Sequence, residues 1–233
     1  MLHAILSQDN SKNTITNLYI ALQSDATPAL ADLREHWSAD ISSPLSDVQW
    51  DQALHHVKEV SRNMRLRFTQ INYLHRTYLT PHRIAKMYPG AKSECPRCRH
   101  HKADFIHMVW SCPVLEETWH SITDILSEVV ETPVLLTPES CLLGIRTQTK
   151  QTKYRNKLIN LALALFKQLI AMNWKSHTAP NIKLWLKLLL KWAQAESFCM
   201  SEAMGGKKIN EENTLTGDNY MSKILAKNDD RPP

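Results

Sequence analysis

The sequence predicts an all-α protein, an irregular multi-helix domain that carries a small insert with three cysteines and one histidine. Glycine is scarce, with 5 among 233 residues, whereas leucine, lysine, alanine and glutamate are common, which favours helices over a β architecture rich in turns. Apolar residues make up 43% of the chain, enough for a sizeable core. They recur at intervals of three and four over most of the chain, the spacing of amphipathic helices.

Residues 1–45 are expected to form short N-terminal helices. Apolar residues recur at helical spacing over residues 13–24. Thr27 followed by Pro28 is a typical helix start, because proline suits the first turn, where its missing N–H is not needed. The next helix should therefore run from there to about Trp37.

Residues 46–90 are expected to form a long basic amphipathic helix region. Ser46 begins it, and Gln49 three residues later completes a possible capping box. The periodicity fits one long helix or two helices that meet at a kink near residues 61–63. A second cap-plus-proline signal, Thr80-Pro81, starts a short helix at the end of the region. The stripe expected to be buried consists of Trp50, Leu54, Val57, Ser61, Met64, Phe68, Ile71, His75 and Tyr78.

Residues 121–206 are expected to form a C-terminal helical region, and residues 207–233 a polar tail that is disordered. The expected elements are a helix from Pro113 to about Glu131, a brief element ending at Gly144-Ile145, a strongly apolar helix over 151–175, and a helix from Pro180 to about Met200. The first of these should bury Leu115, Trp119, Ile122, Leu126 and Val129. In the last, a solvated basic face should hold Lys183, Lys187 and Lys191.

Residues 91–120 hold the insert, whose ligand-type side chains are Cys95, Cys98, His107 and Cys112. A Cys₃His set satisfies a tetrahedral Zn²⁺, and the gap of two residues lets the first two thiolates reach one ion. Four protein ligands leave no open position, so we expect one structural zinc rather than a catalytic one. His100 and His101 are competing ligands, and apolar residues on both sides of His107 should pack beneath the site.

A metal explains these cysteines better than disulfides do. The chain has 5 cysteines, an odd number, and its first residues are too short and polar for a signal peptide, so a reducing compartment is expected. A redox-active Cys-x-x-Cys is an alternative, but no βαβ pattern surrounds the pair. Cys141 and Cys199 lie in apolar helical contexts and are expected to be small core residues.

Basic side chains are concentrated in residues 62–102, which carry ten lysines and arginines and a single acid, Glu94. Such a concentration of positive charge favours a polyanionic partner, and arginine forks suit phosphate. The alternative is that the arginines are solvated; Phe68 and Tyr78, on the expected buried stripe, are more readily interpreted as core. The candidate nucleic-acid contacts are Arg62, Arg65, Arg67, Arg76, Arg83, Lys86, Arg97, Arg99 and Lys102.

Several stretches also occur in an order typical of one family. They are Trp37-Ser-Ala-Asp40-Ile41 and Trp50, then Asn63-Met-Arg65-Leu-Arg67, then Leu74-His75-Arg76-Thr77-Tyr78-Leu79-Thr80-Pro81-His82-Arg83-Ile84, then Cys95-Pro96-Arg97-Cys98, and last Asp104-Phe105-Ile106-His107-Met108-Val109-Trp110-Ser111-Cys112-Pro113 and Trp119. With them the chain resembles the C-terminal region of non-LTR (long interspersed element) retrotransposon reverse transcriptases. The resemblance covers about residues 15–200. Pro96 replaces an aromatic residue, and Lys102-Ala103 a glycine, of the family's pattern.

The resemblance implies a zinc-stabilised helical module that binds RNA and DNA, with the polymerase domains of the parent polyprotein as possible further partners. The one Asp-Asp pair, Asp229-Asp230, lies in the polar tail, away from any hairpin that could present it to Mg²⁺, so we expect no enzyme activity. A cysteine hydrolase is the remaining enzymatic alternative. The other reading is a structural or protein-interaction scaffold with zinc as a staple.

The sequence also indicates where the protein acts. The most apolar run, Leu158 to Trp174, contains Lys167, Gln168 and Asn173, so it is expected to be a buried helix rather than a membrane span. Without a signal peptide, we expect an intracellular protein of the nucleus, the cytoplasm or both, which is not secreted.

Overall fold

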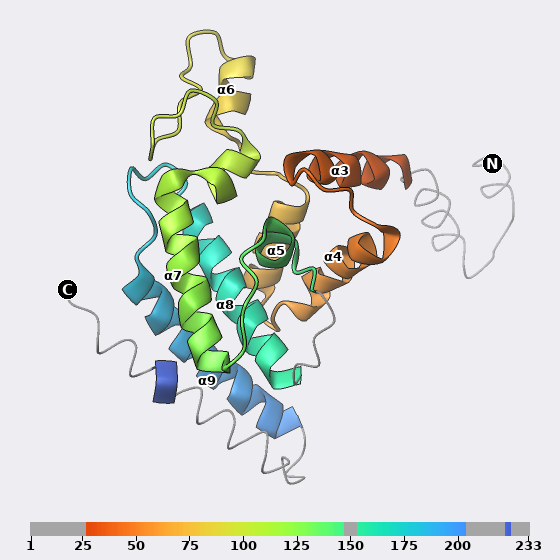
Figure 1. The fold of residues 1–233 in the computed structure, drawn as a ribbon, viewed down its shortest axis with the longest axis vertical. Coiled ribbons are helices and arrows are strands. Elements are labelled where there is room, and N and C mark those ends of the chain that lie inside the picture. Colours follow the sequence, from red (N-terminus) through yellow and green to blue (C-terminus); the bar gives the residue numbers. More distant parts are fainter. Residues whose placement is uncertain (1–26, 147–152, 204–221, 225–233) are drawn as a thin grey trace, which may run out of the picture. The chain divides into compact units, whose positions relative to one another are not determined.

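The structure, a computed structural model, describes residues 27–146, 153–203 and 222–224. Every regular element in these residues is helical, so the all-α prediction is confirmed. The chain divides into two compact units, Met1–Trp50 and Asp51–Pro233. Figure 1 shows the helices of both units. The helix expected over residues 13–24 lies outside the described part.

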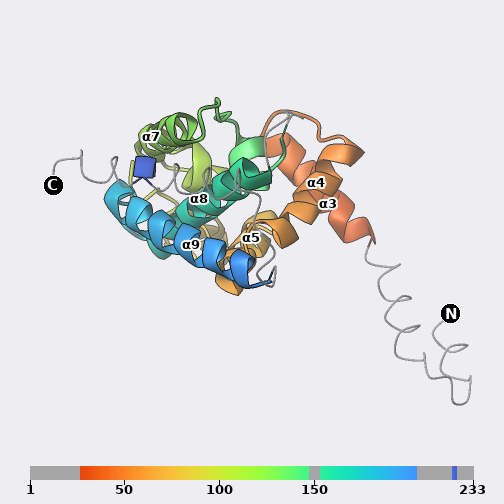
Figure 2. The ribbon, with the colours of Figure 1, turned by 90° about the horizontal axis from the view of Figure 1, so that it is seen from below.

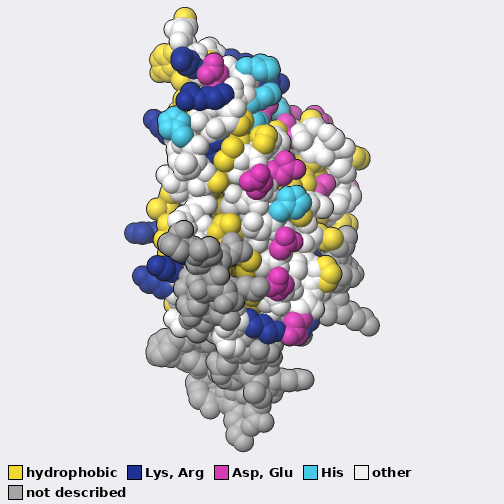
Figure 3. Space-filling model, turned by 60° about the vertical axis from the view of Figure 1, so that its left-hand side comes forward, with side chains coloured by type: hydrophobic (Ala, Val, Ile, Leu, Met, Phe, Trp, Pro, Cys, Tyr) yellow, Lys and Arg dark blue, Asp and Glu magenta, His cyan; other side chains and the backbone are white. Residues whose placement is uncertain are grey.

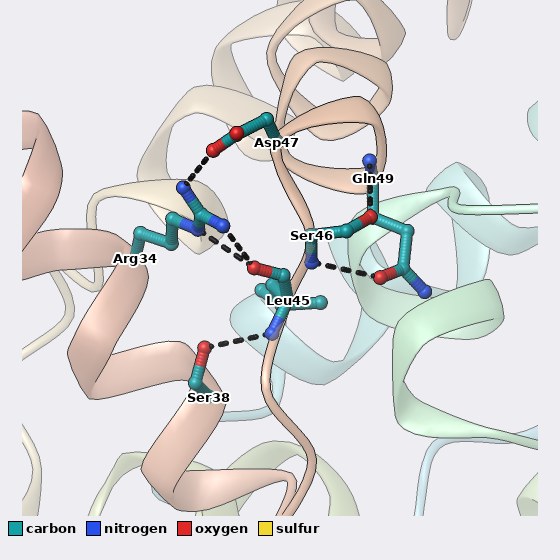
Figure 4. Close-up of polar contacts among 6 residues, drawn as sticks. All are labelled: Arg34, Ser38, Leu45, Ser46, Asp47 and Gln49. Atoms are coloured by element: carbon teal, nitrogen blue, oxygen red, sulfur yellow. Dashed lines mark hydrogen bonds and ion pairs between the residues drawn. The ribbon is translucent and has the colours of Figure 1, made fainter.

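The first unit contains α3, Thr27–Asp40, and the start of α4, Asp47–Glu59. The helix predicted from Thr27 is confirmed and ends three residues beyond Trp37. Arg34 bonds the Leu45 carbonyl through Nε at 2.8 Å and pairs with the Asp47 carboxylate at 2.5 Å (Figure 4). These contacts fix the turn between the two helices.

The start of α4 is the capping box expected from the sequence. The Ser46 N–H donates to Gln49 Oε1 at 2.9 Å, and the Gln49 N–H donates to Ser46 Oγ at 3.3 Å (Figure 4). Two N–H groups that the first helical turn leaves without partners are thereby satisfied. The Leu45 N–H is bonded too, to Ser38 Oγ at 3.1 Å.

The second unit contains the remaining elements in an order close to the predicted one. They are α5 (Met64–Leu74), α6 (Pro81–Met87), the π-helical turn η1 (His107–Ser111), α7 (Pro113–Val130), a second π-helical turn η2 (Glu139–Leu143), α8 (Lys153–Met172) and α9 (Ile182–Ala203). The predicted starts at Thr80-Pro81 and Pro113 are confirmed. Thr80 caps α6 by accepting a hydrogen bond from the Arg83 N–H at 3.1 Å.

The core of the second unit forms around α8, which packs against both α5 and α9 (Figures 1 and 2). Helix α7 joins this core through Trp119, whose ring meets Phe166 of α8 edge-to-face at 4.5 Å. All five residues of the predicted α7 stripe are buried. The Trp185 indole of α9 donates to the Ala162 carbonyl of α8 at 2.9 Å, so the two helices are also hydrogen-bonded.

The predicted buried stripe fails in α5. Of the two alternatives left open, the structure has two helices, and Asn63 caps the second by accepting a hydrogen bond from the Arg65 N–H at 2.8 Å. The buried face of α5 is out of phase with the predicted stripe. Met64 and Phe68, expected in the core, are therefore 71% and 63% exposed. The buried residues of α5 are Leu66, Thr69, Gln70, Tyr73 and Leu74.

A buried polar cluster links α5, η2 and α8. Lys167 of α8 is fully buried, and its ammonium donates to Gln70 Oε1 and, at 3.2 Å, to the Leu142 carbonyl. The Tyr73 hydroxyl donates to the Lys167 carbonyl at 2.9 Å. Burial lowers the pKa of Lys167 to about 7, because the charged form is poorly solvated there.

Gly144 closes this cluster at the end of η2. Its φ of 74° is in the left-handed region. A Cβ added there would lie 2.3 Å from Cγ of the buried His56 ring, so the site requires a residue without a side chain. Burial also lowers the pKa of His56 well below its usual value. Cys141, expected in the core, is fully buried here; the side chain of Cys199 is outside the described residues.

Three residues of the predicted disordered tail, 207–233, are described. Residues 222–224 are helical, Ile224 is fully buried, and Lys223 pairs with Glu131. The remainder of that prediction concerns residues outside the described part. No described helix combines the length and the apolar character needed to cross a bilayer.

Candidate metal centre

The side chains of the four predicted ligands lie close together. Cys95, Cys98, His107 and Cys112 each offer a ligand atom, and these atoms all lie within 4.8 Å of one another. The Sγ atoms of Cys95 and Cys112 are 3.9 Å apart, and Cys98 Sγ is 3.2 Å from His107 Nε2. Two thiolates on one tetrahedral Zn²⁺ stand about 3.8 Å apart when each Zn–S bond is about 2.3 Å. A disulfide requires about 2.05 Å, so the spacing suits an ion rather than a bridge.

The π-helical turn η1 explains the spacing of the last two ligands. The Cys112 N–H donates to the His107 carbonyl at 3.1 Å, which closes a turn over five residues. Residues five apart lie on opposite sides of an α-helix but on the same side of a π turn. The wider turn therefore directs both side chains to the metal position. Asp104 supports its start by accepting the His107 N–H at 3.0 Å.

The first two ligands lie on a tight turn. The Cys95 N–H donates to the His100 carbonyl at 2.8 Å, and the Arg99 N–H donates back to the Cys95 carbonyl at 3.0 Å. Arg99 has a φ of 62°, in the left-handed region. The turn gathers both cysteines on one side. The competing ligands His100 and His101 are exposed and lie outside the four-residue cluster, with the His100 ring stacked on His107 at 4.8 Å.

The environment of the cluster affects the protonation of its donor atoms. Cys95 and Cys112 are fully buried, and burial raises the pKa of Cys112 to about 11, so this thiol keeps its proton unless a bound cation displaces it. Burial and the neighbouring His100 lower the pKa of His107, which favours the neutral imidazole that a metal binds. Buried thiols and a neutral imidazole are a donor set that zinc selects, so the residues present fit that ion.

Three hydrogen bonds join the insert to α7, to α6 and to the segment between α8 and α9. The Trp119 indole of α7 donates to the Val109 carbonyl at 3.0 Å, and His177, between α8 and α9, donates from Nδ1 to the Pro96 carbonyl at 2.9 Å. The His82 N–H of α6 donates to the Ala103 carbonyl at 3.1 Å. Of the apolar residues on both sides of His107, Phe105, Met108 and Val109 are buried and Ile106 is half-buried.

Arg97 is not the surface contact that the sequence predicted. Its side chain is only 7% exposed, and Nη1 donates to the Met108 carbonyl of η1 at 2.8 Å. Nε and Nη2 are buried without a hydrogen-bond partner. A guanidinium in this position cannot reach a phosphate at the surface. Instead it joins the turn that carries Cys95 and Cys98 to the turn that carries His107.

The other eight candidate contacts fall into two groups. Arg67 and Arg76 are half-buried; Arg67 donates from Nε to the Ser61 carbonyl at 2.6 Å, and the Arg76 guanidinium lies 5.2 Å from the centre of the Phe105 ring. The exposed group consists of Arg62, Arg65, Arg83, Lys86, Arg99 and Lys102.

Most of the exposed cations are not neutralised. Lys102 lies 3.9 Å from Asp104, a long pair between an exposed lysine and a half-buried aspartate. None of the ion pairs found among the described residues includes Arg65, Arg83, Lys86 or Arg99. The sequence between Glu59 and Glu94 contains no acid at all. This part of the surface therefore carries uncompensated positive charge.

Sequence reasoning missed Phe68 as a surface residue, because the stripe was continued in phase across residues 61–63. Asn63, a good N-cap residue, was the available signal for a new helix start.

No protein-family model matches the chain.

Proposed function

We propose that the chain is a nucleic-acid-binding module whose basic surface is held in place by one structural zinc ion. The single observation that carries this proposal is the position of the cations. Cys98 holds one corner of the cluster, and the exposed Arg99 is its direct neighbour; α6, with Arg83 and Lys86, is hydrogen-bonded to the same insert through Ala103. A metal that fixes the insert would therefore also fix these positive charges.

The position of the acidic side chains supports the proposal of a nucleic-acid-binding surface. Helix α7 has no lysine or arginine, and its exposed acids are Glu116, Glu117, Asp124 and Glu128. Figure 3 shows acidic side chains along α7, and basic and histidine side chains over the end formed by α6 and the insert. A polyanion would be repelled by the first surface and attracted by the second. A polyanion would therefore approach the protein from the end that carries the metal centre.

We further propose that the chain derives from the C-terminal region of a retrotransposon reverse transcriptase and has no catalytic activity of its own. The metal-ligand spacing and the basic stretch before it support this origin. Binding would hold RNA or DNA for the polymerase domains of the same polyprotein.

A protein-interaction scaffold is the second candidate. The exposed apolar side chains of α5, Met64 and Phe68 among them, favour it, because such groups commonly mark docking surfaces. Under that proposal zinc is a staple only, and affinity for nucleic acid is absent or insensitive to salt.

Salt dependence separates the two candidates. For five phosphate contacts to a single strand, affinity should fall by about a hundredfold between about 50 and 200 mM salt, because each contact releases counterions. Fluorescence anisotropy with a labelled single-stranded RNA measures the affinity at each salt concentration. In the double variant Arg65→Ala/Arg83→Ala, the slope of log affinity against log salt should decrease in magnitude by about 1.4.

The matched control removes two exposed lysines of α9, Lys187→Ala/Lys191→Ala. Net charge falls equally in both variants, so a general charge effect would weaken them alike. Equal slopes for the two variants, or wild-type binding that salt does not change, would contradict the proposed function.

A further inference from the structure

Exposed apolar groups and uncompensated cations occur in the same short segment. Eleven large hydrophobic side chains are exposed in the described part of the chain, and six of them belong to residues 64–88: Met64, Phe68, Ile71, Leu79, Met87 and Tyr88. The same segment has no acidic residue. Binding of phosphates by charge alone does not require exposed apolar side chains. These side chains therefore need a separate explanation.

The outer face of α5 brings both kinds of side chain together. Met64, Phe68 and Ile71, at positions i, i+4 and i+7, lie along one face and are 71%, 63% and 38% exposed. Arg65 is exposed on the same face, three residues before Phe68. Helix α5 contains no aspartate or glutamate. An aromatic ring in solvent thus has a guanidinium one turn away and no repelling charge on its own helix.

The inner face of α5 holds this surface rigid. Tyr73 is fully buried, is bonded to Lys167 of α8, and meets the Phe105 ring of the insert edge-to-face at 5.9 Å. Leu66 and Leu74 are buried beside it. Since α5 is fixed through its core residues, Phe68 can be changed without removing a core contact.

We propose that this face of α5 binds single-stranded nucleic acid, with an unpaired base stacked on Phe68 and the adjacent phosphate on Arg65. This inference rests on the proposed function and names its substrate class. In a duplex the bases are already stacked and only their edges are accessible, so the apolar groups of α5 would meet the charged backbone. In a single strand the base faces are free, and aromatic side chains stack on them without regard to sequence.

The test compares a labelled oligouridine of about a dozen nucleotides, within the site sizes of single-strand binders, with a hairpin duplex of equal charge. Wild-type protein should bind the single strand more tightly. Phe68→Ala should weaken single-strand binding by about five- to hundredfold, the loss of one stacked base, and leave duplex binding unchanged. Phe68→Tyr, which keeps the ring, should bind as wild type. Met172→Ala removes an apolar group of α8 that is slightly more exposed than Phe68 and should also bind as wild type.

Equal affinity of the Phe68→Ala variant and wild-type protein for the single strand overturns the inference, and the α5 face is then left for a protein partner. Equal affinity of wild-type protein for single strand and duplex overturns it too. In either case salt-sensitive binding of wild-type protein would persist and the proposed function would stand. If wild-type protein binds neither probe at low salt, the proposed function itself has failed.

Discussion

Cys98→Ser is expected to abolish stoichiometric zinc binding and to lower the free energy of unfolding by several kcal/mol. Cys98 offers one of the four ligand atoms of the cluster, and a serine hydroxyl is a poor substitute for a thiolate. Structural zinc contributes about 10–16 kcal/mol to the folding of zinc-finger peptides. Here the packed helices supply part of the stability, so the loss should be smaller. Zinc per chain, measured by mass spectrometry, and urea unfolding, followed by circular dichroism, give the two quantities.

The effect should spread beyond the insert. Met108 and Val109 of η1 are fully buried, and Val109 accepts the hydrogen bond from the Trp119 indole of α7. Cys141→Ala is the control, because it removes a thiol that lies outside the cluster and is more deeply buried than that of Cys98. It should keep one zinc per chain. Unchanged zinc content and helicity in Cys98→Ser would show that the cluster is not a metal site.

The second large effect expected is a rise in stability with pH caused by Lys167. The pKa of this lysine is about 7 in the folded protein and about 10.4 in an unfolded chain. Between these values the unfolded state binds more protons, so the free energy of unfolding increases with pH, by up to about 1.4 kcal/mol per unit. Below pH 7 both states are protonated and the contribution of Lys167 is constant.

The clearest window lies between about pH 7 and pH 9. Above it the thiol of Cys141, whose pKa is raised to about 12, opposes the increase, because the unfolded chain then loses a proton that the folded chain keeps. Zinc ligands also titrate in unfolded protein, so the comparison is made with Lys167→Met at saturating zinc. The difference between wild type and variant should change by about 2–3 kcal/mol across this window. A constant difference would mean that Lys167 remains charged in the folded protein.

The cluster of three cysteines and one histidine could be predicted from the sequence because the signal for it is local. Cys95 and Cys98 are two residues apart, and the spacing to His107 and Cys112 already fits a tetrahedral set. Helix starts at Ser46, Thr80 and Pro113 were likewise local signals, each a cap or a proline with a known preference. The π turn that directs His107 and Cys112 to one point has no such signature.

The features that depend on packing could not be predicted in this way. The sequence allowed a break at residues 61–63 as an alternative. The exposure of Phe68 depends on how α5 packs after that break, and the spacing of apolar residues does not predict this packing. Arg97 is basic in the sequence and buried in the structure, since its surroundings come from η1. Lys167 interrupts an apolar helix, and only the fold brings Gln70 to its ammonium.

The central claim is that a metal ion holds the nucleic-acid-binding surface in place. The most direct measurement takes one preparation, determines zinc per chain, and then measures affinity for single-stranded RNA before chelation, after it, and after zinc is returned. We expect one zinc per chain, a clear loss of affinity on chelation because the insert loses its fixed structure, and recovery on reloading. Protein that contains no zinc as purified, or stripped protein that binds RNA as tightly as before, would contradict the claim.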